Sequence, residues 1–89
     1  MTDIAQTLVE RGKNYGSFEE RCRVEQAIKR AIAQGRQWDV MPDDCRSALE
    51  MIATKISRIS DGNNAEHFDS WHDIAGYAKL VADRLDGAP

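Results

Sequence analysis

The sequence has few of the residues that mark the best-known kinds of functional site. Its only two cysteines, Cys22 and Cys45, form no CxxC pair and have no histidine at zinc-finger spacing. We therefore expect no metal ligands. Both cysteines fall among the apolar positions of expected helices, where buried free thiols are typical. Thiols that stay reduced point to a protein of the cytoplasm.

Long apolar runs and an excess of basic residues are also absent. No stretch approaches the ~20 apolar residues of a membrane span, and Met1-Thr2-Asp3-Ile4 does not begin a signal peptide. The formal net charge is −3, whereas nucleic acids and anionic membranes attract basic surfaces. We expect no membrane contact, and nucleic-acid binding through Lys29, Arg30 and Arg36 is the least favoured function.

Apolar residues recur at alternating spacings of three and four, which is typical of helices with one buried side. The 89 residues are expected to form one domain, 1–89, with an all-α fold and no strands. We predict a small antiparallel bundle of three longer helices plus a short N-terminal helix. The longer helices are expected from a cap at Ser17 to about Gln34, from Pro42 to the Asp61-Gly62-Asn63-Asn64 turn, and from a cap at Asp69 or Ser70 to about Leu85.

Specific residues define the ends and the inward sides of these helices. Ser17 with Glu20 has the spacing of a capping box. Thr2 or Asp3 is expected to cap the first helix, which fades at Gly12 before an Asn14-Tyr15-Gly16 turn. The side chains expected to point inward are Ile4, Leu8 and Val9 in the first helix, Cys45, Leu49, Ile52, Ile56 and Ile59 in the third, and Trp71, Ile74, Ala78, Val81 and Leu85 in the last.

The start of the last helix, Asp69 to Tyr77, is the most distinctive stretch. Its Gly76 costs roughly 1 kcal/mol of helix stability relative to alanine, but it lets another backbone or a ligand come close. Gly76 and Leu80 lie opposite the inward stripe, with Tyr77 beside them. A chain of this size has a limited core. We therefore predict a homodimer with this helix at or beside the interface.

Charged residues on the last two helices form a candidate ligand-binding site. Glu50, Lys55 and Arg58 come from one helix, and Asp69, Asp73 and Tyr77 come from the next. A solvated polar surface is one interpretation of these residues. The other is a mixed-charge site in which Lys55 and Arg58 meet the aspartates, to neutralise them or to bind phosphate. We predict no catalytic residues among them.

Several short motifs, taken together, resemble a known family. They are Tyr15-Gly16, Glu50-Met51-Ile52, Lys55-Ile56-Ser57-Arg58 and Asp69-Ser70-Trp71-x-Asp73-Ile74-Ala75-Gly76-Tyr77. This combination resembles a family of short phage and prophage proteins of unknown function, over about Arg11 to Leu85. The resemblance implies a phage or prophage origin and the cytoplasm of a host cell, but no reaction.

A more distant likeness is to the MazG-type all-α nucleoside triphosphate pyrophosphohydrolases, which are small helical bundles that pair into dimers. Those enzymes hold magnesium with an E-x-x-E pair on one helix and an E-x-x-D pair on the next. Glu50 and Asp73 stand near two of these positions, but Ala53 and Ser70 stand at two others. Magnesium bound to triphosphate needs several carboxylate oxygens, so the ligand set is incomplete.

We therefore predict a non-catalytic phage accessory protein that binds a host protein or a nucleotide-like ligand, without a cofactor. The alternative is a divergent, magnesium-dependent nucleoside triphosphate pyrophosphohydrolase.

Overall fold

The computed structural model describes residues 3–15 and 17–87, apart from the side chains of residues 11–15. It contains four helices, α1 (Ile4–Tyr15), α2 (Phe18–Ile32), α3 (Asp43–Ser60) and α4 (Phe68–Leu85). No strand occurs in these two ranges. The prediction of an all-α fold with three longer helices and a shorter first helix is therefore confirmed.

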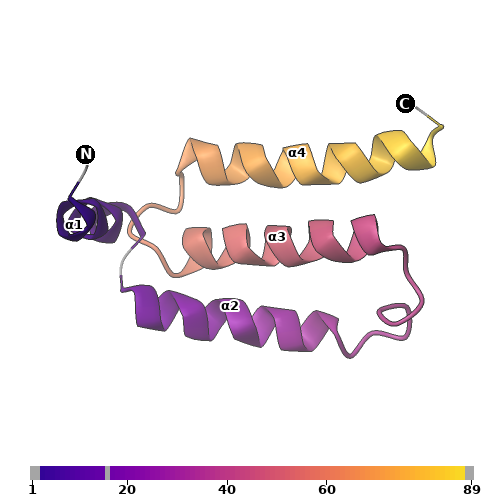
Figure 1. The fold of residues 1–89 in the computed structure, drawn as a ribbon, viewed down its shortest axis with the longest axis horizontal. Coiled ribbons are helices and arrows are strands. Elements are labelled where there is room, and N and C mark those ends of the chain that lie inside the picture. Colours follow the sequence, from indigo (N-terminus) through magenta and orange to yellow (C-terminus); the bar gives the residue numbers. More distant parts are fainter. Residues whose placement is uncertain (1–2, 16, 88–89) are drawn as a thin grey trace.

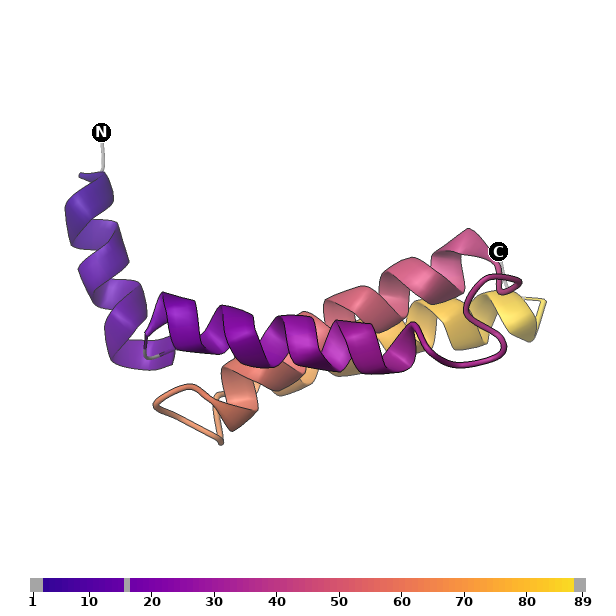
Figure 2. The same cartoon turned by 90° about the horizontal axis from the view of Figure 1, so that it is seen from below.

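Helix α3 is the centre of the arrangement. Helices α2 and α4 pack against it on opposite sides, each antiparallel to it, and α1 lies across one end of the three (Figure 1). Seen from below, α1 projects away from the other helices (Figure 2).

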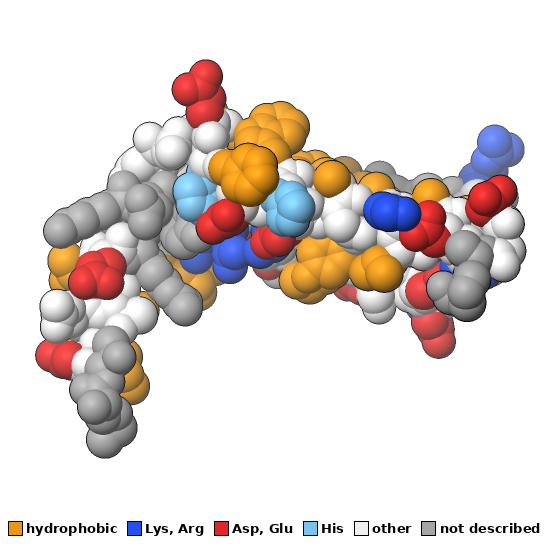
Figure 3. Space-filling model, turned by 90° about the horizontal axis from the view of Figure 1, so that it is seen from above, with side chains coloured by type: hydrophobic (Ala, Val, Ile, Leu, Met, Phe, Trp, Pro, Cys, Tyr) orange, Lys and Arg blue, Asp and Glu red, His pale blue; other side chains and the backbone are white. Residues whose placement is uncertain are grey.

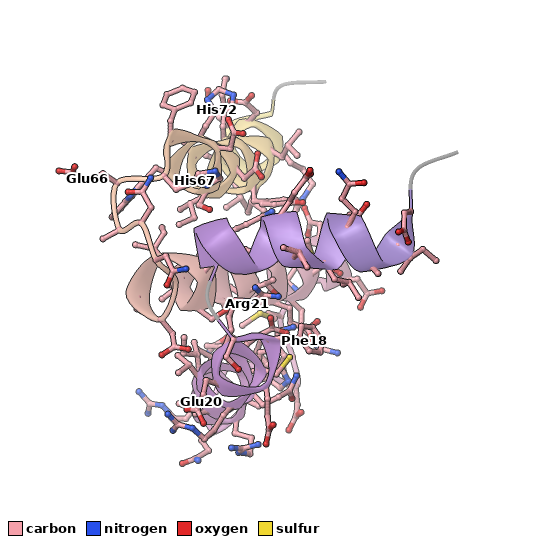
Figure 4. The ribbon with its side chains drawn as sticks, turned by 90° about the vertical axis from the view of Figure 1, so that its left-hand side faces the viewer. Phe18, Glu20, Arg21, Glu66, His67 and His72 are labelled. Carbon is pink, nitrogen blue, oxygen red and sulfur yellow. The ribbon has the colours of Figure 1, made fainter. Side chains whose placement is uncertain are left out.

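In the view from the α1 end, His67 and His72 belong to the start of α4, and Phe18 and Arg21 to the start of α2 (Figure 4). The Arg21 guanidinium lies 5.4 Å from the Phe18 ring centroid.

Small side chains occupy the contacts between these helices. Among the described residues, those that are buried are Ala48, Ala53, Ser57 and Ser70. Ala53 and Ser57 lie about 140–180° around α3 from Ala48, at 100° per residue, so they face α2 while Ala48 faces α4. The buried Ser57 hydroxyl donates a hydrogen bond to the Thr54 carbonyl at 2.7 Å. Small, satisfied side chains let the helix backbones approach closely.

The apolar stripe predicted to point inward on α3 is not buried in this chain. Leu49 is 38% exposed and Ile56 is 39% exposed. The physical reason is that α3 is contacted on two opposite sides, and the stripe lies mainly on the flank between them. Trp71 on α4 is 54% exposed, so its predicted place in the core is also wrong.

The first helix departs from the prediction in the same way. Ile4, Leu8 and Val9 are exposed rather than inward, because α1 projects beyond the other helices. Asp3 does cap α1 as predicted, since its Oδ1 accepts a hydrogen bond from the Ala5 amide at 3.0 Å. The helix continues to Tyr15 instead of fading at Gly12. The side chain of Tyr15 and the whole of Gly16 lie outside the described part.

Two predicted caps are wrong. Ser17 precedes α2, but its side chain makes no capping hydrogen bond, and Glu20 pairs instead with Arg23 at 3.1 Å. Helix α4 begins at Phe68, after His67, rather than after Asp69 or Ser70. The Ser70 hydroxyl is 3.1 Å from His67 Nδ1, so Ser70 joins α4 to the preceding connector from inside the helix.

None of the four helices, over the residues described, is long and apolar enough to cross a membrane.

We expect Ala53→Leu to destabilise the protein by about 1–3 kcal/mol, because the larger side chain must be forced into a closed helix contact. Ala27→Leu is the matched control, since Ala27 is exposed on α2 and alanine and leucine have similar helix propensities. Urea unfolding curves measure both. Equal stabilities for the two variants would contradict the close α2–α3 contact.

Candidate functional site

An ion pair joins the middle of α3 to the first half of α4. Lys55 Nζ lies 3.0 Å from Asp73 Oδ2. The Lys55 side chain is only 13% exposed, whereas that of Asp73 is 43% exposed. An ammonium that is withdrawn from water needs a compensating charge. Asp73 is therefore occupied in neutralising Lys55, which is one of the two roles that the sequence left open for this pair.

A second ion pair links the other ends of the same two helices. Arg84 donates two hydrogen bonds to the Asp44 carboxylate, from Nε to Oδ2 and from Nη2 to Oδ1, the latter at 2.8 Å. These hydrogen bonds lower the pKa of Asp44 below its usual value. They also raise the pKa of Arg84. Two parallel bonds of this kind fix orientation as well as distance.

The two ion pairs share one antiparallel register. Asp44 is eleven residues before Lys55 on α3, and Arg84 is eleven residues after Asp73 on α4. Eleven residues make about three helical turns, so both pairs lie on the same flank of the α3–α4 seam. The Asp44–Arg84 pair was not predicted from the sequence. This matching spacing is the signal that would have found it once Lys55 was placed opposite Asp73.

Between and beside the two ion pairs, the surface is hollowed. One open, shallow groove of about 420 Å³ runs along α4 and is lined by residues of that helix alone. A smaller hollow of about 230 Å³ lies next to it over the seam. We call this flank the Tyr77 face, because Tyr77 and Leu80 line both hollows. The groove is lined by His72, Asp73, Gly76, Tyr77, Lys79, Leu80 and Asp83. The smaller hollow adds Asp44, Ser47, Ala48, Met51 and Val81.

Gly76 makes the middle of the groove shallow-walled and open. A Cβ added at this position would have no heavy atom within 4 Å. Nothing in the chain itself therefore requires glycine there, although glycine costs roughly 1 kcal/mol in a helix. The predicted close approach at Gly76 is not made by any described part of this chain.

The opposite flank of the seam is also hollowed, by about 360 Å³, and it differs in character. We call it the Ile52 face. Its lining residues are Cys45, Ala48, Leu49, Ile52, Ala78, Val81, Ala82 and Leu85. None of these residues is charged. Ala48 and Val81 line hollows on both flanks, because they lie in the seam itself. Seen from above α4, apolar side chains follow the upper edge of the view and form one patch at the middle of the lower edge, with histidine and charged side chains between them (Figure 3).

The structure brings together only part of the predicted site. Lys55 and Asp73 pair directly, and Tyr77 lines the same groove as Asp73. Asp69 is exposed one turn before Asp73. Arg58 is partly buried, about one turn along α3 from Lys55.

Glu50 does not belong with these residues. It lies about 140° around α3 from Lys55, at 100° per residue, on the side that faces α2. Glu50 therefore faces α2, whereas Asp73 lies on α4, on the opposite side of α3. One small ion could not bind both.

The charges on the Tyr77 face pair with one another. Lys79 Nζ lies 2.7 Å from Asp83 Oδ2. Lys55 pairs with Asp73 at 3.0 Å. The His72 ring stacks on Phe68 with a centroid distance of 5.3 Å. Within residues 3–15 and 17–87, no group of three histidine, cysteine, aspartate or glutamate side chains could hold a metal ion. The site offers an apolar groove with a charged rim.

Comparison with protein families gives this helical protein its classification. The chain belongs to a family described as a domain of unknown function, DUF6378, whose family model matches residues 2–85. Neither the comparison with curated proteins nor that with solved structures gives a match. The match includes the residues of the resemblance, about Arg11 to Leu85, and the family description states neither a phage origin nor a relation to the MazG-type enzymes.

The unequal exposure of the Lys55–Asp73 pair predicts an asymmetric response to mutation. We expect Asp73→Ala to cost about 1–3 kcal/mol, because it leaves a mostly buried ammonium without its partner. We expect Lys55→Met to cost less than about 1 kcal/mol, because methionine packs where the lysine stem did and the freed Asp73 can be hydrated. Urea unfolding of both variants at one protein concentration measures the difference. A larger cost for Lys55→Met would contradict the burial of Lys55.

Proposed function

We propose that this protein is a non-catalytic accessory protein, encoded by a phage or prophage, which acts in the host cytoplasm by binding a host protein. The binding surface is the Tyr77 face, and the protein works as a homodimer. The observation that carries the proposal is the pairing of charges at the groove: the cations that could serve chemistry or bind phosphate are already neutralised by aspartates.

The shape of the groove favours a protein ligand. Gly76 leaves the middle of α4 open, and Tyr77, Leu80 and Met51 offer apolar side chains beside it. Leu80 is 69% exposed. A groove with apolar anchors and a polar rim fits an extended segment or a helix from a partner. Because no heavy atom lies within 4 Å of a Cβ added at Gly76, a segment of the partner can approach α4 closely there.

The same charges disfavour a nucleotide-like ligand. A phosphate at the groove would meet Asp73 and Asp83, whereas Lys55 and Lys79 are held by these same carboxylates. A phosphate that bound either lysine would share the ammonium with a carboxylate, and the two negative groups would repel each other.

The alternative function, a divergent magnesium-dependent pyrophosphohydrolase, needs Glu50 and Asp73 on one ion. Their places on different sides of α3, and Ala53 and Ser70 at the other two ligand positions, argue against it. Ala53 and Ser70 are also buried in helix contacts, so they serve packing.

We expect no pyrophosphate release when the purified protein is incubated with ordinary nucleoside triphosphates and magnesium. An inorganic pyrophosphatase converts released pyrophosphate to phosphate, and phosphate detection is sensitive enough to record slow turnover. Release that disappears in Glu50→Gln or Asp73→Asn would establish the enzyme and overturn the proposal.

The binding proposal is tested with Gly76→Leu. This change fills the groove while favouring the helix by up to about 1 kcal/mol, so a loss of binding would not reflect unfolding. Ala27→Leu adds the same side chain on an exposed position of α2. We expect a host protein to be captured by the wild type and by Ala27→Leu but not by Gly76→Leu, and to bind the wild type directly when purified. Capture that does not distinguish the two variants would contradict binding at the Tyr77 face.

A further inference from the structure

We propose that a second copy of this chain covers the Ile52 face, so that the α3–α4 hairpins of two chains pack together as a four-helix bundle. The inference rests on the homodimer of the proposed function and names its interface. It places the interface on the flank opposite Gly76 and leaves the Tyr77 face of each protomer open.

The apolar residues on α3 follow the pattern of a helix that packs against another chain. Cys45, Leu49, Ile52, Ile56 and Ile59 recur at spacings of four, three, four and three, the spacing of a helix that packs along a continuous seam. In the single chain this stripe is only half-covered, with Leu49 and Ile56 more than a third exposed. Obligate homodimer interfaces resemble a domain core cut in half. The Ile52 face has the composition and the exposure of such a half.

The accessible surface of the single chain is larger than that of a compact chain of the same mass. The single chain exposes 6601 Å², whereas a compact folded chain of its 10.0 kDa exposes about 5,200 Å². The excess is about 1,400 Å² per chain. Obligate homodimers bury about 2,000–5,000 Å² in total, or about 1,000–2,500 Å² per chain. The excess has the size of one side of an obligate interface, and the exposed surface of the projecting α1 is included in it.

The radius of gyration leads to the same conclusion. It is 15.1 Å, whereas a compact chain of this length has about 12 Å. The projecting α1 contributes to this extension, so the radius of gyration agrees with the excess surface without locating it.

The absence of charged residues from the lining of the Ile52 face suits contact with a second copy. A two-fold symmetric contact brings each patch against a copy of itself, so like charges would oppose one another. The chain carries a net charge of −3, but no residue lining the Ile52 face is charged. The Tyr77 face, in contrast, has Asp44, Asp73 and Asp83 on its rim. An uncharged patch suits self-association better than recognition of an oppositely charged partner.

Two residues on α3 provide a matched test. Leu49 and Met51 are both 38% exposed, but Leu49 lines the Ile52 face and Met51 the Tyr77 face. Light scattering at micromolar concentration should give twice the chain mass for the wild type and for Met51→Asp, and one chain mass for Leu49→Asp. A dimer that survives Leu49→Asp and is lost in Met51→Asp would overturn this interface while sparing the homodimer. A wild type of one chain mass would overturn the homodimer itself.

A second measurement needs no variant and so does not depend on the folding of Leu49→Asp. Cys45 lines the Ile52 face, and Cys22 lies on α2 outside it. Alkylation by a bulky maleimide, followed by peptide mass spectrometry, gives a rate for each thiol. We expect the Cys45 rate, relative to Cys22, to rise at least tenfold when the protein is diluted until light scattering records single chains. An unchanged ratio across that transition would overturn the placement of the interface on the Ile52 face.

Discussion

The antiparallel register of α3 against α4 determines the character of both surfaces of the seam. Lys55–Asp73 and Asp44–Arg84 lie about three helical turns apart on one flank, and they hold the two helices at a fixed offset along their length. The four charged residues come from one flank, and no residue lining the other flank is charged, although Arg84 Nη2 lies 3.6 Å from Cys45 Sγ at the end of that flank. One register thus produces a charged, hollowed Tyr77 face and an apolar Ile52 face.

Small side chains lie in the contacts within the chain, and large apolar side chains lie mostly on its surface. Ala48, Ala53, Ser57 and Ser70 occupy the contacts within the chain, where small residues allow close helix packing. Of the large aliphatic side chains of α3, Leu49 and Ile56 are exposed and Ile52 and Ile59 are partly exposed, where they would stabilise a contact between chains. A binding protein built in this way gains stability from pairing while it keeps a separate groove for its partner.

The sequence was sufficient to predict the helices but not which of their sides would be covered. Spacings of three and four predicted α3 and α4 to within about two residues, since a helix period can be recognised in one segment alone. The same spacings wrongly predicted that Leu49 and Trp71 are buried within the chain, because a period identifies an apolar side without identifying what covers it. The caps at Ser17 and at Asp69 or Ser70 were wrong because polar side chains can bond to several neighbours at a helix start.

Like the fold, the candidate site was predicted in part from the sequence. Lys55, Asp73 and Tyr77 were recognised from their motifs and do lie on one face. Glu50 was grouped with them by its place in a motif, but the rotation of 100° per residue places it toward α2. The Asp44–Arg84 pair was missed, because a contact between residues so far apart in sequence depends on the register of two helices.

The central claim is that the core of this fold is completed between two chains. The most direct measurement is the thermal unfolding of the wild type, followed by circular dichroism over a hundredfold range of protein concentration. A fold that depends on association is stabilised by mass action, so the account predicts a Tm that rises steadily with concentration. A Tm that stays constant over the whole range would show that the single chain is a complete folding unit, and would contradict the account.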